Sequence, residues 1–167
     1  MLIKIEKIMD KMINFVGYIT GFLLLVMILN VSYDVMMRYA FSNSSIAMQE
    51  FEWHLFAVII LFGMGYALKE NAHVRVDFLY DSFSYKTQAV INIVGTLLFL
   101  IPLAILITYG SYEFVLDAYT SGEISEDPGG LTHRWIIKAM IPFAFIFLIF
   151  CAINYIISNI NIYRGSK

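Results

Sequence analysis

Four long apolar stretches without a charged residue constrain this chain more than any other feature. They are Met12–Tyr33, Phe56–Leu68, Thr87–Tyr112 and Ala139–Tyr163. An α-helix needs about 20 residues to cross a hydrocarbon core of roughly 30 Å. Three of the stretches meet this length, and the second meets it if its helix begins near Gln49. We therefore expect an all-α membrane protein with four transmembrane helices.

The composition supports the same class. Hydrophobic residues make up 60% of the 167 positions and charged residues 14%, against about 45–50% and about 25% in ordinary soluble domains. A soluble chain this short has too little interior to hide so much apolar surface. The net charge of −2 and the lack of a basic run argue against nucleic acid as a partner.

We expect one membrane domain over residues 1–167. Its spans are placed at residues 12–33, 49–69, 87–112 and 135–160, with connecting loops at 70–86 and 113–134. Ahead of the first span, Leu2, Ile5 and Met9 recur at helical spacing while Lys4 and Lys7 occupy another face. This pattern predicts a short interfacial amphipathic helix that lies on the membrane before the chain turns inward.

The distribution of Lys and Arg predicts the orientation. Eight of these eleven residues fall on one side: in the N-terminus, at Lys69 and in the loop 70–86 that follows it, and in the C-terminus. Three fall on the other side: Arg38, Arg134 and Lys138. Both termini are therefore expected in the cytoplasm, and the loop 113–134 on the outer side.

Ionisable side chains at mid-membrane depth mark transport paths by default, and every Asp, Glu, Lys and Arg here falls at a span end or in a loop. The chain is therefore a poor candidate for a self-sufficient pump. The amides of Asn30, Asn92 and Asn154 approach such depths, and we expect them to form hydrogen bonds between helices.

Cofactor chemistry has little support. Only His54 lies at a span, while His73 and His133 fall in loops on opposite sides, so paired haem ligands cannot easily converge. The acidic residues and histidines lack metal-ligand spacing. Cys151, the single cysteine, excludes an intrachain disulfide and a cysteine metal cluster, and is read as a small buried hydrophobe. We expect no catalytic residue, no cofactor and no metal.

Two pairs of polar residues share a helix face at span ends. Asp34 and Arg38 are four apart, which favours a local ion pair near the lipid headgroups. Glu50 and His54 are also four apart. They are interpreted as a structural or partner-contacting pair rather than a proton relay.

The start of the fourth span carries two cations in an unfavourable place. Arg134 and Lys138 lie on the less basic side and at the positive end of a helix dipole. An anionic group should compensate them. The candidates are acidic residues of the preceding loop, such as Glu123, a lipid phosphate, or a partner protein. Thr132 is a candidate cap for this helix.

Several motifs together resemble the small membrane subunit of tripartite ATP-independent periplasmic (TRAP) transporters. The resemblance covers about Arg38 to Pro142, in the branch with a longer periplasmic loop. It rests on Gln49–Glu50, His54–Leu55–Phe56, His73–Val74–Arg75–Val76–Asp77, Glu123–Ile124–Ser125, Pro128–Gly129–Gly130–Leu131, Arg134–Trp135, Lys138 and Ile141–Pro142. This chain has Thr132 where the family commonly has proline.

The resemblance implies a scaffold in the bacterial inner membrane. Such a subunit braces a large elevator-type membrane subunit, which carries the substrate and sodium sites. A periplasmic substrate-binding protein delivers an organic acid and docks on both. The candidate partner-contact residues are Arg38, Glu50, His54, Arg75, Asp77, Glu123, Arg134, Trp135 and Lys138.

The sequence leaves two other classes of protein open. A small self-contained four-helix exporter would need a carboxylate embedded in the membrane. A four-helix redox protein would handle haem or quinone. Both fit the number of spans, and both lack their expected chemistry in this sequence.

Overall fold

The computed structural model describes residues 2–72 and 80–165. Its elements are α1 (Leu2–Phe41), α2 (Ile46–Lys69), α4 (Tyr85–Gly95), the π-helical segment η1 (Thr96–Leu100), α5 (Ile101–Thr120) and α6 (Trp135–Tyr163). α4, η1 and α5 follow one another without a break, so Tyr85–Thr120 acts as one long helix. The described residues thus form four helices that are long and apolar enough to cross a membrane. The expectation of an all-α chain with four spans is confirmed.

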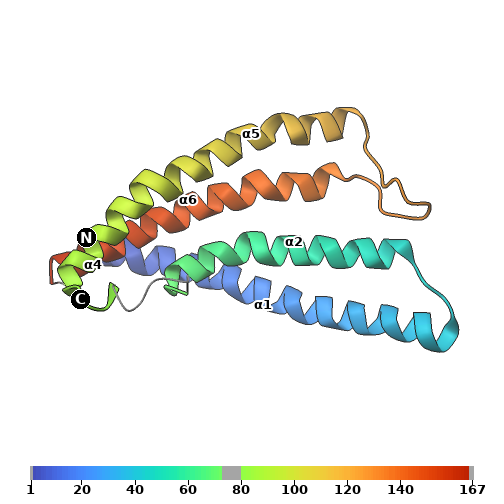
Figure 1. Ribbon diagram of the computed structural model, residues 1–167, viewed down its shortest axis with the longest axis horizontal. Coiled ribbons are helices and arrows are strands. Elements are labelled where there is room, and N and C mark those ends of the chain that lie inside the picture. Colours follow the sequence, from blue (N-terminus) through green and yellow to red (C-terminus); the bar gives the residue numbers. More distant parts are fainter. Residues whose placement is uncertain (1, 73–79, 166–167) are drawn as a thin grey trace.

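The four long helices lie side by side in a flat row. Across Figure 1 the order is α5, α6, α2 and α1, and each neighbouring pair in this order is in contact. α1 also crosses to meet α6 where α1 begins and α6 ends. We call this the termini end, and the opposite end, where α5 joins α6, the loop end. α6 is the central helix, because it contacts α1, α2, α4 and α5.

The N-terminal segment differs from the expectation of a separate surface helix. Leu2–Met12 forms the first turns of α1, which runs unbroken for 40 residues. The expectation of a surface helix rested on apolar residues and lysines, and it took no account of three other residues in this segment. Glu6 is 2% exposed and Ile13 is fully buried, and together with Asp10 they recur at i, i+4 and i+7, the spacing of one helix face. That face packs against α6, so this segment belongs to the bundle.

A change of helix type marks the middle of the third span. In η1 the backbone widens to π geometry, and the N–H of Ile101 donates to the carbonyl of Thr96, five residues earlier. Pro102 follows at once, at the start of α5. A proline inside a helix removes one backbone donor and clashes with the carbonyl four residues before it. The π segment accommodates this local conflict.

Small residues allow the helices to approach closely. At Gly65 of α2, an added Cβ would lie 2.7 Å from the Phe147 ring and 2.8 Å from the Cys151 sulfur of α6. At Gly17 of α1 it would lie 2.5 Å from the Tyr66 ring of α2. Both contacts are shorter than side chains tolerate. Glycine at these positions therefore sets the spacing between helices, as is common in membrane bundles.

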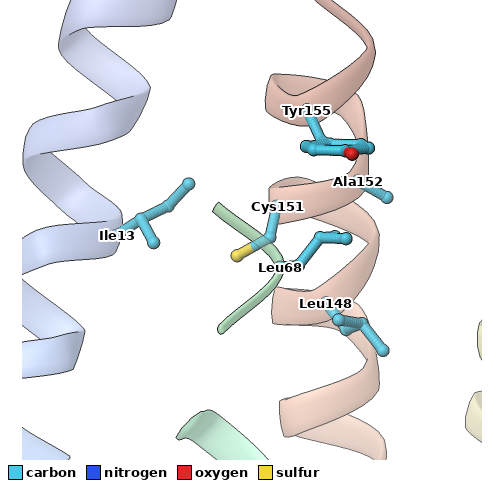
Figure 2. Close-up of a cluster of buried hydrophobic side chains, with 6 residues drawn as sticks. All are labelled: Ile13, Leu68, Leu148, Cys151, Ala152 and Tyr155. Atoms are coloured by element: carbon cyan, nitrogen blue, oxygen red, sulfur yellow. The ribbon is translucent and has the colours of Figure 1, made fainter. Parts of the chain in front are cut away.

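A small apolar core lies where α1, α2 and α6 meet. Figure 2 shows its buried members, which are Ile13, Leu68, Leu148, Cys151, Ala152 and Tyr155. Cys151 is 1% exposed and has a free thiol, as expected for a cysteine that acts as a small hydrophobe. This core lies toward the termini end, so it joins the three helices there.

Most of the apolar surface faces outward. In the most hydrophobic 18-residue window of each long helix, 11% to 28% of residues are buried, with the highest share in α6. Phe22, Leu29, Phe99 and Leu106 are among the large side chains that are more than 60% exposed. In water such surface would be strongly unfavourable. The flat row therefore needs lipid or another protein on both of its faces.

Candidate functional site: a loop anchored on Glu50

The loop that joins α5 to α6, residues 121–134, folds back on itself. The N–H of Ser125 donates to the carbonyl of Leu131 at 3.1 Å, and the N–H of Arg134 donates to the carbonyl of Glu123 at 3.1 Å. At the tip, the N–H of Gly130 donates to the carbonyl of Asp127 at 3.0 Å. These bonds satisfy backbone groups that would otherwise need water. The loop is therefore held in a defined conformation by its own backbone hydrogen bonds.

The carboxylate of Glu50 anchors this loop to α2. One oxygen accepts a hydrogen bond from the Ser125 hydroxyl. The other accepts one from the backbone N–H of Leu131 at 2.5 Å. Hydrogen bonds to an ionised group are stronger than neutral ones. A single side chain thus ties both arms of the loop to a neighbouring span.

Gly130 makes this anchor possible. A Cβ at this position would lie 2.8 Å from Oε2 of Glu50 and would overlap the side chain of Ser125. The glycine therefore lets the loop backbone come close to the carboxylate.

Glu123 compensates the two cations at the start of α6, which are Arg134 and Lys138. Lys138 forms an ion pair with it, and Nε of Arg134 lies 3.6 Å from its Oε1. The Lys138 ammonium also lies 4.1 Å from the centre of the Phe114 ring, a cation–π contact. Of the three sources considered, the protein itself supplies compensation. Contact of these residues with a partner stays a prediction.

Trp135 and the start of α6 show a further difference. The Trp135 ring meets Tyr119 of α5 edge-on at 5.4 Å, an arrangement that aromatic pairs favour. The cap of α6 is Arg134, without a side-chain hydrogen bond, so the expectation that Thr132 caps this helix is wrong. The Thr132 hydroxyl instead lies 2.8 Å from Nδ1 of His133. His133 has a φ of +61°, and this left-handed turn moves Thr132 out of the capping position.

His54 lies one helical turn beyond Glu50 but in a different setting. It lines an apolar cavity of about 360 Å³ beneath the loop, together with Leu131 and with side chains of α1, α2 and α6. The two residues share a face, as expected. Glu50 binds the loop, and His54 faces the space below it.

The α1–α2 corner carries the remaining described candidate. Arg38 forms the expected ion pair with Asp34, which is 4% exposed. One turn earlier, the amide of Asn30 donates to the carbonyl of Met48 at 3.1 Å, joining α1 to the start of α2. The candidates Arg75 and Asp77 lie outside the described residues.

The termini end holds a second polar cluster, which the sequence pattern did not predict. Glu6 accepts from the amide of Asn161 at 2.6 Å, and Asp10 from the amide of Asn154 at 2.8 Å. Asn92 of α4 donates to Asn159 of α6 at 2.9 Å. The expected interhelical role of Asn30, Asn92 and Asn154 is confirmed. The spacing of these residues is the signal that predicts the cluster. Glu6 and Asp10 are four residues apart, and their partners Asn154 and Asn161 are seven residues apart, so the members of each pair lie on one helix face.

Polar contacts at both ends brace the row of helices. Among residues 2–72 and 80–165, no group of three or more His, Cys, Asp or Glu side chains is placed to hold a metal ion. The polar groups lie at helix ends, where they tie elements together. At the loop end they also fix the shape of an exposed surface.

Comparison with known proteins identifies relatives of this chain. The family model described as tripartite ATP-independent periplasmic transporters, DctQ component, matches residues 9–161. A putative TRAP transporter small permease protein of Haemophilus influenzae is 28% identical over 70% of this chain and 68% of its own length. The ectoine TRAP transporter small permease protein TeaB of Halomonas elongata is 29% identical over 73% of this chain and 62% of its own length.

Proposed function

Because the chain belongs to the DctQ family of tripartite ATP-independent periplasmic transporters, we propose that it is a non-catalytic scaffold for a larger transporting subunit. It is a multi-pass protein of the bacterial inner membrane and a small permease subunit of a TRAP transporter. The proposal concerns what this subunit contributes. It braces the large elevator-type subunit and helps the periplasmic substrate-binding protein to dock.

The observation that carries the scaffold role is the flat row of helices. The spans are held together at both ends by polar contacts and leave apolar side chains exposed on the outside. A row of this kind presents a wide, fixed apolar surface to the large elevator-type subunit, which moves during transport. The ionisable side chains lie at the span ends, so this chain has little to offer a charged solute in mid-membrane.

The loop 121–134 is the part proposed to face the periplasm and meet the binding protein. Its anchor on Glu50 and its internal hydrogen bonds favour a preformed surface. A preformed surface loses less conformational entropy when a partner docks. Arg134, with a side chain 39% exposed beside Glu123, is the proposed contact.

The substrate is proposed to be an organic acid, taken up with sodium that binds in the large subunit. One relative is named for ectoine, and the choice of substrate is proposed to lie with the other two components. Uptake by proteoliposomes that hold the complete membrane complex and the binding protein would test this. Uptake should require all three components and an inward sodium gradient.

A charge-reversal experiment tests the scaffold and docking roles. Arg134→Glu should weaken complex formation or transport more than Lys4→Glu, which reverses an exposed charge at the termini end. The readouts are the amount of large subunit that co-purifies and the uptake rate with saturating binding protein. Equal effects of the two variants, or none, would contradict the docking role of Arg134.

The competing exporter function has its own test. Proteoliposomes that hold only this chain should show no proton-coupled movement of organic cations. Such movement by the chain alone would overturn the scaffold proposal.

A further inference from the structure

The first turns of α1 carry three lysines on the face that points away from the other helices. Lys4, Lys7 and Lys11 recur at i, i+3 and i+7, so they share one helix face. Met9 and Ile13 are buried, and at 100° per residue they lie on the opposite face. α1 is also at the edge of the row of helices (Figure 1), and all three lysines are exposed.

These lysines have no anionic partner. None of the three forms an ion pair within the described part of the chain. The carboxylates that are closest in sequence belong to Glu6 and Asp10, and they accept hydrogen bonds from Asn161 and Asn154 of α6. These contacts turn both carboxylates toward the bundle. The outer face of α1 therefore carries positive charge that attracts an anion from outside the chain.

The position of the lysines along α1 matches the edge of a bilayer. At 1.5 Å per residue, the uncharged run 12–33 rises about 33 Å, close to the roughly 30 Å of a hydrocarbon core. With this run in the core, Lys11 lies at the core boundary and Lys7 about 6 Å further out. The headgroup layer is about 5–7 Å thick on each side. Both side chains therefore reach the depth of lipid phosphates.

An apolar groove of about 550 Å³ continues from Lys11 into the hydrocarbon depth, between α1 and α6. Apart from Lys11, its lining is apolar and consists of Met12, Phe15, Val16, Phe143, Ile146, Phe147 and Phe150. The residues from α1 follow Lys11 toward the middle of the span. A phosphate held at Lys11 would therefore place an acyl chain of the same lipid at the mouth of this groove, where apolar surface is buried on binding.

We propose that this face of α1 binds one anionic phospholipid, such as phosphatidylglycerol. Its phosphate lies between Lys7 and Lys11, with Lys4 as a further cation, and one acyl chain fills the groove. Charge complementarity selects the headgroup, because phosphatidylethanolamine carries its own ammonium, which three unpaired lysines repel. The site is separate from the scaffold and docking roles, which concern contacts with other subunits.

The test of the headgroup uses the full chain in nanodiscs with equal parts of phosphatidylglycerol and phosphatidylethanolamine. Native mass spectrometry measures the lipid retained on the released protein, and one phosphatidylglycerol should be retained in preference. Lys7→Gln and Lys11→Gln should each lower this preference about fivefold, as expected for a lysine beside an anionic lipid. Lys86→Gln removes an exposed lysine at the start of α4 and should behave as the parent.

The chain offers a matched pair of variants for the groove. Met12 lines it and is 55% exposed, so Met12→Trp should fill the groove from its open side. Ile28 is 51% exposed on the same helix but lies outside the groove, so Ile28→Trp is the control. Met12→Trp should lower the retention of phosphatidylglycerol, and Ile28→Trp should leave it unchanged.

Three results would overturn the proposal. One is retention in proportion to the lipid supplied, and another is an equal loss for Lys7→Gln, Lys11→Gln and Lys86→Gln, which would show a response to overall charge. The third is loss of the bound phosphatidylglycerol in the complete membrane complex, because this face would then belong to the large subunit. Each variant is compared at matched helical circular dichroism, so that unfolding is not read as lipid loss. A failure of the scaffold role would leave retention by this chain alone unchanged.

Discussion

The backbone N–H of Leu131 donates to Oε2 of Glu50 at 2.5 Å, although the two residues are 81 positions apart in the chain. The other oxygen of the same carboxylate accepts from the Ser125 hydroxyl. One side chain on α2 therefore decides where the loop between α5 and α6 lies.

Replacing Glu50 by Ala should release the loop. Two hydrogen bonds to a charged acceptor are lost, and these are stronger than hydrogen bonds between neutral groups. Amide hydrogens of residues 121–134 should then exchange at least about tenfold faster by hydrogen–deuterium mass spectrometry. Glu52→Ala, two residues along the same helix, is the control. Unchanged exchange in Glu50→Ala would show that the loop holds its shape without the anchor.

Gly130→Ala should weaken the same anchor without changing any charge. The added Cβ would overlap Ser125 and lie 2.8 Å from Oε2 of Glu50, so the loop must move away at a cost of about 1–3 kcal/mol. Limited proteolysis of the loop should become faster. Gly110→Ala, in open surroundings with ordinary helical backbone, should leave cleavage unchanged. If both alanine variants resist protease as the parent does, the close approach at Gly130 is unimportant.

Exchanging the charges of Glu123 and Lys138 tests whether local compensation is what these residues need. Lys138→Glu alone places two carboxylates together and removes the cation from the Phe114 ring. Its apparent Tm in detergent should fall. Adding Glu123→Lys should recover part of the loss, because the pair is restored with opposite polarity. A double variant no more stable than Lys138→Glu would contradict a direct pairing.

Gly65→Leu should separate α2 from α6. Its side chain would enter space held by Phe147 and Cys151, and overpacking of this kind costs about 1–3 kcal/mol. The apparent Tm should drop, and the Cys151 thiol, now 1% exposed, should react faster with a maleimide. Gly63→Leu, where an added Cβ meets nothing within 4 Å, should change neither property.

Much of the candidate site could be read from residue types, but little of its geometry. The spacing of Asp34 and Arg38 predicted their ion pair, because four residues span one helical turn. The unfavourable position of Arg134 and Lys138 predicted a compensating anion but left three sources open. Glu123 was among the named residues, and only folding placed it beside both cations.

In the N-terminal segment, by contrast, the local pattern led to a wrong prediction. Its alternation of lysines and apolar residues was interpreted as a helix lying on the membrane surface. The decisive residues were Glu6 and Asp10, whose amide partners lie 155 and 144 positions away. A local pattern describes the faces of a helix but not what each face meets.

The sequence by itself determined the all-α class and the four spans. A hydrocarbon core of set thickness requires about 20 apolar residues in a helix that satisfies its own backbone, and that requirement is local. The tertiary structure alone decided the order of the helices, the burial of Glu6 and the capture of the loop by Glu50. These depend on which helix ends meet in space, and contacts between distant segments follow from the packing of the whole bundle.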